Sequence, residues 1–407
     1  MEGVKTISDE KTYFNKILQE SFKGSKILDV EGTTTGNAGD NYMSTVFRYT
    51  VSLLDSNNNA DKKELLVKKL PSNIAWREAL GCELAFRNEA IAYDVIIPSM
   101  KKFRSEDNLA FPMCFHASVE YTILEDLKPL GFKMVDRRLG LDLIHAKLAL
   151  KELGRFHGTS LAMKHSQPEV FADLSSKVHE IIFLPEKKDS FGPHIIESIN
   201  KAVLALKVFR ASGTDLFANS INKLQRLKQS AFESLMELVQ RKGPLSVICH
   251  GDFYLNNIMY KYNESGDVSD IMIIDFQAFR VASLSLDLLY FLTSSLRPGV
   301  MSSHFEELME TYHSSLNEQL KKFAPTAPEV SLKEIHEELK SHSAYGLLMG
   351  FLVLPAVTAL PGNAMDIEKM EACSAEEQFE KNIDMLSPEY FRRIKQIIRD
   401  FETQGYF

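Results

Sequence analysis

The segment that decides the fold reads His250-Gly251-Asp252-Phe253-Tyr254-Leu255-Asn256-Asn257, and it is followed by Ile273-Ile274-Asp275-Phe276-Gln277. Each segment adjoins a short apolar run of the kind that forms a strand, Ser246–Cys249 before the first and Ile271–Ile274 at the start of the second. An aspartate at the start of a loop, an asparagine five residues on and a second aspartate after the next strand can converge on one point. The order of these residues therefore predicts a single polar site between two strands.

Phosphoryl transfer requires this set of side chains. A carboxylate orients the attacking hydroxyl and accepts its proton, and hard oxygen ligands hold Mg²⁺ against the phosphates. We predict that Asp252 is the catalytic residue and that Asn257 and Asp275 are metal ligands. Taken singly, an aspartate after glycine is usually a turn residue and an asparagine is usually a loop hydrogen-bonder. Their combination between two apolar strands favours the functional interpretation.

The first third of the chain has the alternating pattern of a small antiparallel sheet. Apolar-leaning residues occupy every second position from Thr45 to Leu53, which is the period of a half-buried strand. A polar turn at 56–59 leads to a second strand, Glu64–Leu70, which stops before Pro71. A further apolar strand covers Tyr121–Leu124. These runs predict a hairpin-based sheet.

A helix is predicted between the second and third of these strands. Phe86, Glu89, Ala90 and Tyr93 recur at three- and four-residue spacing, which places them on one helix face. We expect this helix to end near Pro98. Because Phe86 and Tyr93 are large and apolar, their face points towards the core and brings Glu89 with it.

Beyond Leu127 the pattern changes to long helical periodicity. Apart from the strand-like island at 245–276, this part is predicted to be mainly helical. The most apolar stretch, Tyr345–Leu360, is interrupted by two glycines and a proline and falls short of the roughly 20 residues needed to span a bilayer. We therefore expect a buried helix and loop there. The composition shift at Leu127–Lys128 predicts two lobes, residues 1–127 and 128–407.

Composition narrows the function classes. The 407 residues contain 47 Lys+Arg and 55 Asp+Glu, a formal net charge of −8, which argues against a nucleic-acid-binding protein because phosphate binding normally needs a basic surplus. The four cysteines lack the close pairs of zinc or redox sites and are predicted to be free thiols in a reducing compartment. The N-terminal segment, 1–20, is charged and amphipathic, so we expect a cytoplasmic protein. Nothing in the sequence indicates an obligate protein partner.

The two polar motifs resemble the catalytic and metal loops of the small-molecule branch of the protein-kinase-like fold, which includes choline kinases and aminoglycoside phosphotransferases. Within this branch the sequence is most similar to the ecdysteroid kinase-like family of insects and other invertebrates. The similarity runs from about Ser25 to Phe401 and includes, in the family's order, Gly39-Asp40-Asn41-Tyr42 with Ser44, Leu66-Val67-Lys68, Phe86…Glu89…Tyr93…Pro98, Leu124-Glu125-Asp126-Leu127, Phe156-His157 and Leu286-Asp287-Leu288.

This resemblance implies an α+β, bilobal protein-kinase-like fold. The N-terminal lobe, 1–127, would bind nucleotide through an antiparallel sheet plus a helix. The larger, mainly helical C-terminal lobe, 128–407, would carry the catalytic and substrate-binding groups. The implied cofactors are ATP and Mg²⁺.

The resemblance also implies roles for residues around the nucleotide. Lys68 would reach the α- and β-phosphates and form an ion pair with Glu89. A strand points Lys68 and Lys69 to opposite faces, so the sequence leaves open which lysine faces ATP. Without the pair, the lysine would be a solvated strand residue and Glu89 an exposed helix charge.

Two main-chain segments complete the implied nucleotide site. Gly36, Gly39 and Ser44 would form a hairpin that covers the phosphates, although their spacing departs from the usual glycine patterns and a plain hairpin turn is the alternative. The segment Glu125-Asp126-Leu127 would be the interlobe hinge whose main chain binds adenine. The alternative for Asp126 is that it caps the next element. His250, His157 and Asp287 would have structural roles.

The implied activity is an ATP- and Mg²⁺-dependent kinase that phosphorylates a hydroxyl group of a small molecule. The acceptor would be an ecdysteroid or another lipophilic alcohol, in hormone inactivation or detoxification. Large apolar groups are compatible with such an acceptor, although helical apolar runs are usually core: Phe183-Leu184, Phe191, Leu289–Leu292 and Tyr345–Leu360.

Two other functions remain open at the level of sequence. One is a kinase for a cationic acceptor of the choline or aminoglycoside kind, which would need clustered carboxylates or an aromatic cage. The other is a catalytically silent protein that binds a nucleotide or a hydrophobic ligand. A protein kinase is disfavoured because Gln277 follows Asp275-Phe276 where that class usually has glycine, and a Walker-type site is excluded because Gly-Lys-[Ser/Thr] does not occur.

Overall fold

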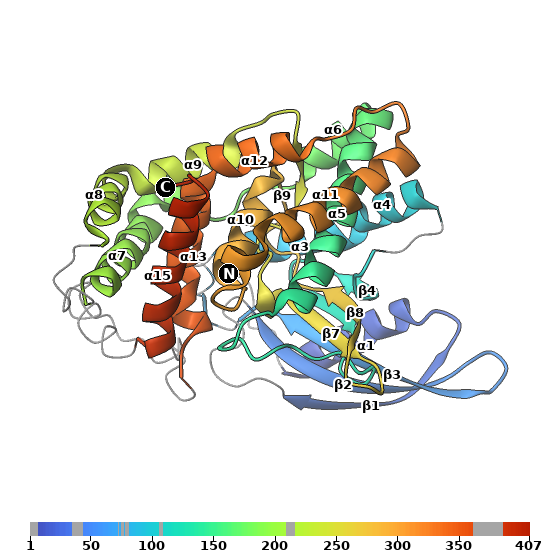
Figure 1. The fold of residues 1–407 in the computed structure, drawn as a ribbon. Coiled ribbons are helices and arrows are strands. Elements are labelled where there is room, and N and C mark those ends of the chain that lie inside the picture. The colour runs from blue at the N-terminus through green and yellow to red at the C-terminus, as the bar shows by residue number, and fades with distance from the viewer. Residues whose placement is uncertain are drawn as a thin grey trace.

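The computed structural model describes residues 7–34, 44–71, 73–74, 77, 81–105, 109–208, 216–360 and 386–407. A twisted antiparallel sheet lies at one end of the molecule, and helices make up most of the remainder (Figure 1). The α+β, two-lobed protein-kinase-like architecture expected from the sequence is confirmed.

The sheet has five strands in the order β1-β2-β3-β5-β4, with every neighbouring pair antiparallel. The strands are β1 (Lys26–Thr34), β2 (Thr45–Leu54), β3 (Ala60–Lys69), β4 (Cys114–Ala117) and β5 (Tyr121–Glu125). The predicted strands at 45–53, 64–70 and 121–124 are confirmed, and β3 begins four residues earlier than predicted.

The two faces of the sheet contact different helices. Helix α1 (Ile7–Ser21) packs Ile17 and Leu18 against Leu65 and Val67 of β3. Because side chains alternate along a strand, Lys68 points to the opposite face. That face is met by helix α3 (Cys82–Ile91), which carries the predicted inward-facing glutamate.

The helix does not end near Pro98. After α3 the chain makes a wider π-helical turn, η1 (Ala92–Ile96), and continues as α4 (Ile97–Arg104). Pro98 lies in the first turn of α4, where a proline is tolerated because the first amides of a helix have no intrahelical acceptor. The prediction of the helix end was therefore wrong, since it treated the proline as a terminator.

The rest of the described chain is mainly helical. Its helices are α5 (Leu143–Ser166), α6 (Pro168–Lys177), α7 (Lys188–Lys207), α8 (Ala218–Leu227), α9 (Ala231–Gln240), α10 (Ser285–Ser294), α11 (Val300–Phe323), α12 (Leu332–Ser341), α13 (Ser343–Val357) and α15 (Pro388–Thr403). Two small ribbons lie among them, β6 (Ser246–Cys249) with β9 (Arg280–Ser283) and β7 (Ile258–Tyr262) with β8 (Val268–Ile273). Strands β6 and β8 correspond to the two apolar runs of the predicted island, whereas β7 lies in the loop expected between them and β9 lies beyond its end at 276.

Paired glycines allow two helix pairs to approach closely. A Cβ atom on Gly158 of α5 would lie 2.5 Å from the Leu316 carbonyl oxygen of α11, and one on Gly350 of α13 would lie 2.9 Å from Thr293 Cβ of α10. Any larger residue would force these helices apart. Helix α13 is the buried helix predicted for the apolar stretch at 345–360, and no helix in the described part of the chain is long and apolar enough to cross a membrane.

Candidate active site

The site begins with a lysine held between two carboxylates. Lys68 Nζ of β3 donates to Glu89 Oε1 of α3 at 2.7 Å and to Asp275 Oδ1, in the loop after β8, at 3.0 Å. Thr122 of β5, the register partner of Lys68, donates to the other Glu89 oxygen at 3.2 Å. Three segments far apart in sequence therefore meet at one ammonium group.

This arrangement settles which of the two neighbouring lysines faces the site. Lys68 is 5% exposed, and its ammonium group meets Glu89 and Asp275, whereas Lys69 points to the α1 side of the sheet and lies over the Tyr121 ring. Burial alone would lower the pKa of Lys68, but the negative charges of Asp275 and Glu89 outweigh it and raise the pKa above its usual value. Lys68 therefore stays charged.

The second part of the site is the loop after β6. Both oxygens of Asp252 accept hydrogen bonds, Oδ1 from the Tyr290 hydroxyl at 2.8 Å and Oδ2 from Asn257 Nδ2 at 2.8 Å. The same Asn257 nitrogen donates to the Asp252 main-chain oxygen at 2.9 Å. The five-residue spacing of aspartate and asparagine thus closes a tight loop around the carboxylate.

The electrostatic surroundings oppose ionisation of Asp252. Burial raises the pKa of Asp252, and the nearby charge of Asp275 raises it further. The hydrogen bonds from Tyr290 and Asn257 act in the opposite direction and lower the pKa. A carboxyl group with a raised pKa is a better proton acceptor than an ordinary solvent-exposed aspartate.

The buried carboxylate of Asp287 holds the main chain of the loop after β6. Asp287 of α10 accepts from the main-chain amides of His250 at 2.7 Å and Gly251 at 2.9 Å, and from His157 Nε2 of α5 at 3.0 Å. Burial would raise the pKa of Asp287, but these hydrogen bonds and the neighbouring histidines lower it overall. Asp287 therefore acts as a fixed anion that holds the loop.

Gly251 cannot be replaced at this anchor. Its φ of +81° lies in the left-handed region, and a Cβ atom would come within 1.9 Å of the Ala278 carbonyl oxygen. Arg280 of β9 donates to the Gly251 carbonyl at 3.0 Å and forms an ion pair with Glu180. The glycine of the His-Gly-Asp motif is thus explained by close backbone packing.

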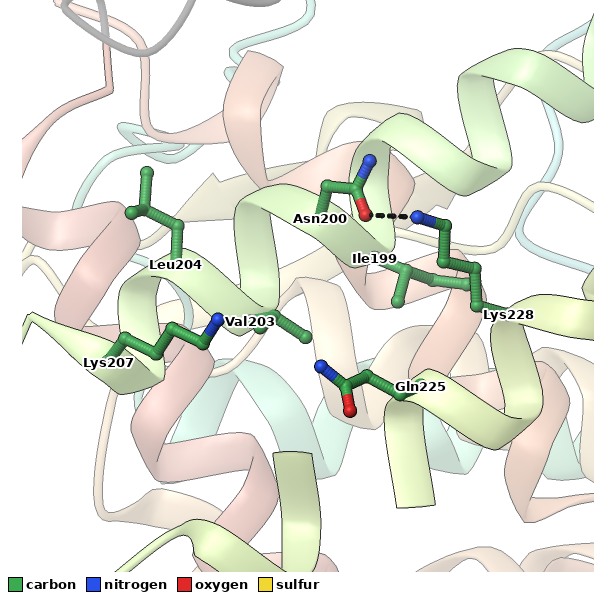
Figure 2. A pocket seen from close by; sticks show the side chains of 7 residues that line it. All are labelled: Ile199, Asn200, Val203, Leu204, Lys207, Gln225 and Lys228. Atoms are coloured by element: carbon green, nitrogen blue, oxygen red, sulfur yellow. Dashed lines mark hydrogen bonds between the residues drawn. The ribbon is translucent and has the colours of Figure 1, made fainter. Parts of the chain in front are cut away.

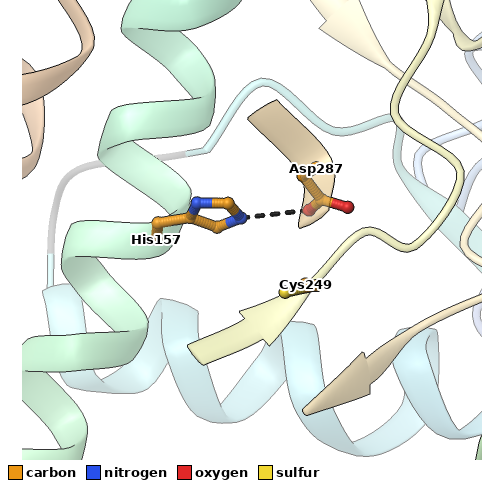
Figure 3. A group of neighbouring side chains, drawn as sticks. All are labelled: His157, Cys249 and Asp287. Carbon is orange, nitrogen blue, oxygen red and sulfur yellow. Dashed lines mark hydrogen bonds and ion pairs between the residues drawn. The ribbon is translucent and has the colours of Figure 1, made fainter. Parts of the chain in front are cut away.

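His157, Cys249 and Asp287 offer polar atoms within 4.8 Å of one another (Figure 3). All three side chains are buried and already contact protein groups. The His157 ring also hydrogen-bonds the Tyr312 hydroxyl at 2.8 Å, and Cys249 Sγ lies 3.5 Å from the Ser283 carbonyl oxygen. We interpret this group as a structural anchor rather than a metal centre.

One residue ties the two polar loops together. The Ile274 amide donates to the Asn257 carbonyl at 3.0 Å, and the Ile274 carbonyl accepts from His250 Nε2 at 3.0 Å. Asp275 follows with a φ of +70°, which L-residues rarely adopt and which turns the chain sharply at the end of β8. These contacts bring Asn257 and Asp275 to the same place.

Both predicted metal ligands keep an oxygen for a cation. Asn257 uses its amide nitrogen for Asp252, and Asp275 uses Oδ1 for Lys68, so Asn257 Oδ1 and Asp275 Oδ2 are without a hydrogen-bond donor among the described residues. The Asp275 side chain is 28% exposed. An amide oxygen and a carboxylate oxygen are ligands that Mg²⁺ prefers, so these residues fit the predicted ion.

The predicted hinge follows β5 directly, but two of its amides are used within the protein. Glu125 N–H donates to the Met113 carbonyl and Asp126 N–H to the Glu64 carbonyl, each at 2.9 Å. Within the described residues, the Leu127 N–H has no acceptor. Of the three hinge amides, Leu127 is therefore the one that remains for a ligand.

The Asp126 side chain does not cap a helix. It forms an ion pair with Arg48 of β2 at 2.6 Å and accepts from the Lys128 amide at 3.0 Å. The next helix, α5, begins only at Leu143 and is capped by Asp142. Asp126 instead closes a turn and links the hinge to the sheet.

The phosphate-covering hairpin is described only in part. Gly36 and Gly39 lie outside the described residues, and Ser44 is a buried residue directly before β2. Strands β1 and β2, which flank this segment, are paired from Lys26↔Leu54 to Thr34↔Phe47.

The apolar residues considered for an acceptor pocket are mostly core. Phe183 and the 289–292 run of α10 are buried, and Phe183 packs 6.3 Å from the ring of Tyr345. A separate pocket of about 270 Å³ lies between α7 and α8 and is lined by Ile199, Asn200, Val203, Leu204, Lys207, Gln225 and Lys228 (Figure 2). It contains none of the predicted site residues.

Tyr290 is the main site residue that the sequence analysis did not identify as functional. It appeared only as one of several apolar groups in the 289–292 run. The signal was its position three residues after Asp287, which places both on the first turns of one helix, but sequence alone does not show that this turn faces Asp252.

The fold, the lysine–glutamate–aspartate cluster and the Asp252 loop define a protein of the protein-kinase-like class. The sequence model of the Ecdysteroid kinase-like family matches residues 38–324. Since this match covers more than half of the chain, the protein belongs to that family. No curated protein has a significant sequence match to the chain.

Solved structures give distant similarities. A microcompartment-associated aminopropanol kinase is 12% identical, with a TM-score of 0.46 and coverage of 97% of this chain and 99% of that chain. A GDP complex of wild-type aminoglycoside 2'-phosphotransferase-IIIa is 13% identical, with a TM-score of 0.39 and coverage of 93% and 98%. A streptomycin–ATP complex of APH(2")-IIa is 14% identical, with a TM-score of 0.33 and coverage of 84% and 99%.

Proposed function

We propose that the protein is an ATP- and Mg²⁺-dependent phosphotransferase that phosphorylates a hydroxyl group of a small molecule. The observation that carries this proposal is the position of Lys68 Nζ between Glu89 and Asp275. A lysine held by a helix glutamate beside a metal-binding aspartate is the arrangement that phosphoryl transfer requires in kinases.

The described residues supply the other parts of this chemistry. Lys68 binds the phosphates, the main chain at Leu127 meets the adenine, and Asp252 orients the acceptor hydroxyl. Asn257 and Asp275 would hold Mg²⁺, and the ion would neutralise charge on the phosphate oxygens. The acceptor oxygen forms a bond to the γ-phosphorus, the bond to the β–γ bridging oxygen breaks, ADP leaves and the hydroxyl proton passes to Asp252.

We propose an ecdysteroid or another lipophilic alcohol as the acceptor, with a role in hormone inactivation or detoxification. Family membership supports this choice of acceptor. We also propose that residues 1–127 act as the nucleotide-binding lobe and 128–407 as the catalytic and substrate-binding lobe, since the sheet ends at Glu125. The free thiols of Cys82, Cys114 and Cys249 support a cytoplasmic location.

The proposal is tested by supplying ATP and Mg²⁺ with a panel of ecdysteroids, other lipophilic alcohols, choline and aminoglycosides, followed by mass spectrometry of the products. We expect a gain of one phosphate on an ecdysteroid or lipophilic alcohol, absent with Asp252→Asn. Phosphorylation of choline or an aminoglycoside alone would contradict the proposed acceptor class. Nucleotide binding without any product or ATP turnover would support a silent binding protein instead.

A further inference from the structure

The catalytic carboxylate is held by a residue from outside its own loop. The Tyr290 hydroxyl of α10 donates to Asp252 Oδ1 at 2.8 Å, while Asn257 Nδ2 holds Oδ2. A carboxylate with a separate donor on each oxygen is fixed in rotation about its Cβ–Cγ bond. Asn257 alone would hold the carboxylate side chain through one oxygen only, which restricts this rotation less than two donors do.

Tyr290 is itself rigidly placed. It is 2% exposed, and its ring stacks on Tyr254 with 5.6 Å between centroids and 9° between planes. It lies one helical turn after Asp287, whose carboxylate binds the amides of His250 and Gly251. The same helix thus fixes both the main chain of the loop and the side chain of Asp252.

We infer that Tyr290 is a positioning residue that aims Asp252 at the acceptor hydroxyl. This inference rests on the proposed function. Each carboxylate oxygen has two lone pairs, and Tyr290 and Asn257 take one on each oxygen. The lone pairs that remain are held in fixed directions, one of which receives the proton of the attacking hydroxyl. Positioning of this kind lowers the barrier because the reacting groups need no reorganisation.

The first experiment uses Tyr290→Phe, which keeps the ring and its stacking on Tyr254 and removes only the hydroxyl. The probe is Mg²⁺-ATP, with hydrolysis by water measured as ADP release and transfer measured to the ecdysteroid and alcohol panel. We expect kcat to fall roughly 10- to 100-fold, the range of a hydrogen bond to a charged group, with an unchanged KM for ATP.

Tyr260→Phe is the matched control. Tyr260 is also fully buried, and its hydroxyl donates to the His145 carbonyl at 3.2 Å, away from Asp252. We expect this variant to keep the wild-type kcat. Equal losses in the two variants, or an unchanged kcat in Tyr290→Phe, would overturn the inference.

A double-variant cycle separates positioning from general support of the fold. If Tyr290 acts through Asp252, adding Tyr290→Phe to Asp252→Asn produces no further loss of residual ATP turnover. A further loss as large as in the wild-type background would show that Tyr290 acts independently of Asp252, and would overturn the inference.

A structural measurement does not depend on activity. A crystal structure of Tyr290→Phe is expected to show the Asp252 carboxylate rotated or in two conformers, with the Asn257 contacts kept. An Asp252 carboxylate that keeps its original single orientation would overturn the inference, whether or not the wild-type protein turns over ATP. An absence of ATP turnover in the wild-type protein would by itself contradict only the proposed function.

Discussion

Lys68 and Asp252 belong to the same site, but they are held in different ways. Lys68 is held by ion pairs that join a strand of the sheet, the helix α3 and the loop after β8. Asp252 is held by hydrogen bonds from its own loop and from α10, all within the helical region. The proposed nucleotide half of the site therefore depends on how the sheet meets the helical region, whereas the proposed catalytic half is complete within one region.

This difference leads to separate expectations for the two halves. Changes at Lys68 should alter how the nucleotide is bound as well as how fast it reacts. Changes around Asp252 should alter turnover while nucleotide binding is largely kept.

The largest effect is expected for Asp252→Asn. The amide keeps the size of the side chain but cannot accept the hydroxyl proton, so kcat should fall about 10²- to 10⁴-fold. The affinity for ATP, measured by isothermal titration calorimetry with Mg²⁺, should change by less than about threefold, well under the 1.4 kcal/mol of a tenfold change. A loss of ATP affinity as large as the loss of turnover would contradict the separation between nucleotide binding at Lys68 and turnover at Asp252.

Lys68→Met should affect the other half. Removing the ammonium group deletes a charge that would meet the phosphates and leaves the buried Glu89 without its ion-pair partner, so kcat/KM for ATP should fall about 10²- to 10³-fold. We expect calorimetry to show weaker ATP binding in this variant, together with slower turnover. An unchanged ATP affinity would contradict the separation of the two halves.

Lys69→Met is the matched control for Lys68. Lys69 is adjacent in β3 but points to the α1 side, near the Tyr121 ring. Its kcat/KM for ATP should stay near the wild-type value. An equal loss in the two lysine variants would mean that strand β3 is disturbed as a whole and that the position of Lys68 is not the cause.

Asp287→Asn tests whether the Asp287 carboxylate holds the loop that carries Asp252 in place. An asparagine side chain cannot accept from two amides and His157 together, so we expect a loss of about 3 kcal/mol in the free energy of unfolding, measured by chemical denaturation. Turnover of the folded variant should fall while ATP affinity is kept. A variant with wild-type stability would contradict the role of Asp287 as the anchor.

Asp400 of α15 is a buried carboxylate of the opposite kind to Asp287. Its side chain accepts a hydrogen bond from the neutral amide of Gln396. Burial raises the pKa of Asp400 to about 6. The folded state therefore holds the proton more tightly than the unfolded state, and this carboxylate destabilises the fold increasingly as pH rises from about 4 to 6.

Asp400→Asn removes this cost. At pH 7.5 the variant should be about 2 kcal/mol more stable than the wild type, and at pH 4.5 most of this difference should disappear. Thermal unfolding at the two pH values measures it, with Glu310→Gln as a control that neutralises an exposed carboxylate. A gain in stability that is equal at both pH values would show that ionisation of Asp400 is not its origin.

The proximity of the residues in the proposed catalytic half was the easier part of the site to predict from sequence. Asp252, Asn257 and Asp275 lie within 24 positions of one another, and the antiparallel pairing of β7 with β8, with Ile258 opposite Ile273, brings Asn257 and Asp275 together. Because these residues are close in sequence, the prediction that they meet does not depend on the rest of the fold. The same reasoning predicted the strands of the sheet, because a period of two is visible along a single run of residues.

What the sequence could not predict depends on contacts between distant segments. Strand alternation separates Lys68 from Lys69 but does not say which face meets α3. Pro98 indicated a helix end because the π-helical turn before it leaves no clear local signal. Tyr290 could not be recognised as a partner of Asp252, since 38 positions and the strands β7, β8 and β9 separate them.

The central claim is that Lys68, Asp252 and Asp275 belong to one phosphotransfer site. A crystal structure with Mg²⁺ and a non-hydrolysable ATP analogue tests it most directly. We predict phosphates beside Lys68, the cation bound by Asn257 and Asp275, and a γ-phosphate that faces Asp252. A nucleotide bound elsewhere, or phosphates that contact neither Lys68 nor the Asp275 loop, would contradict the claim.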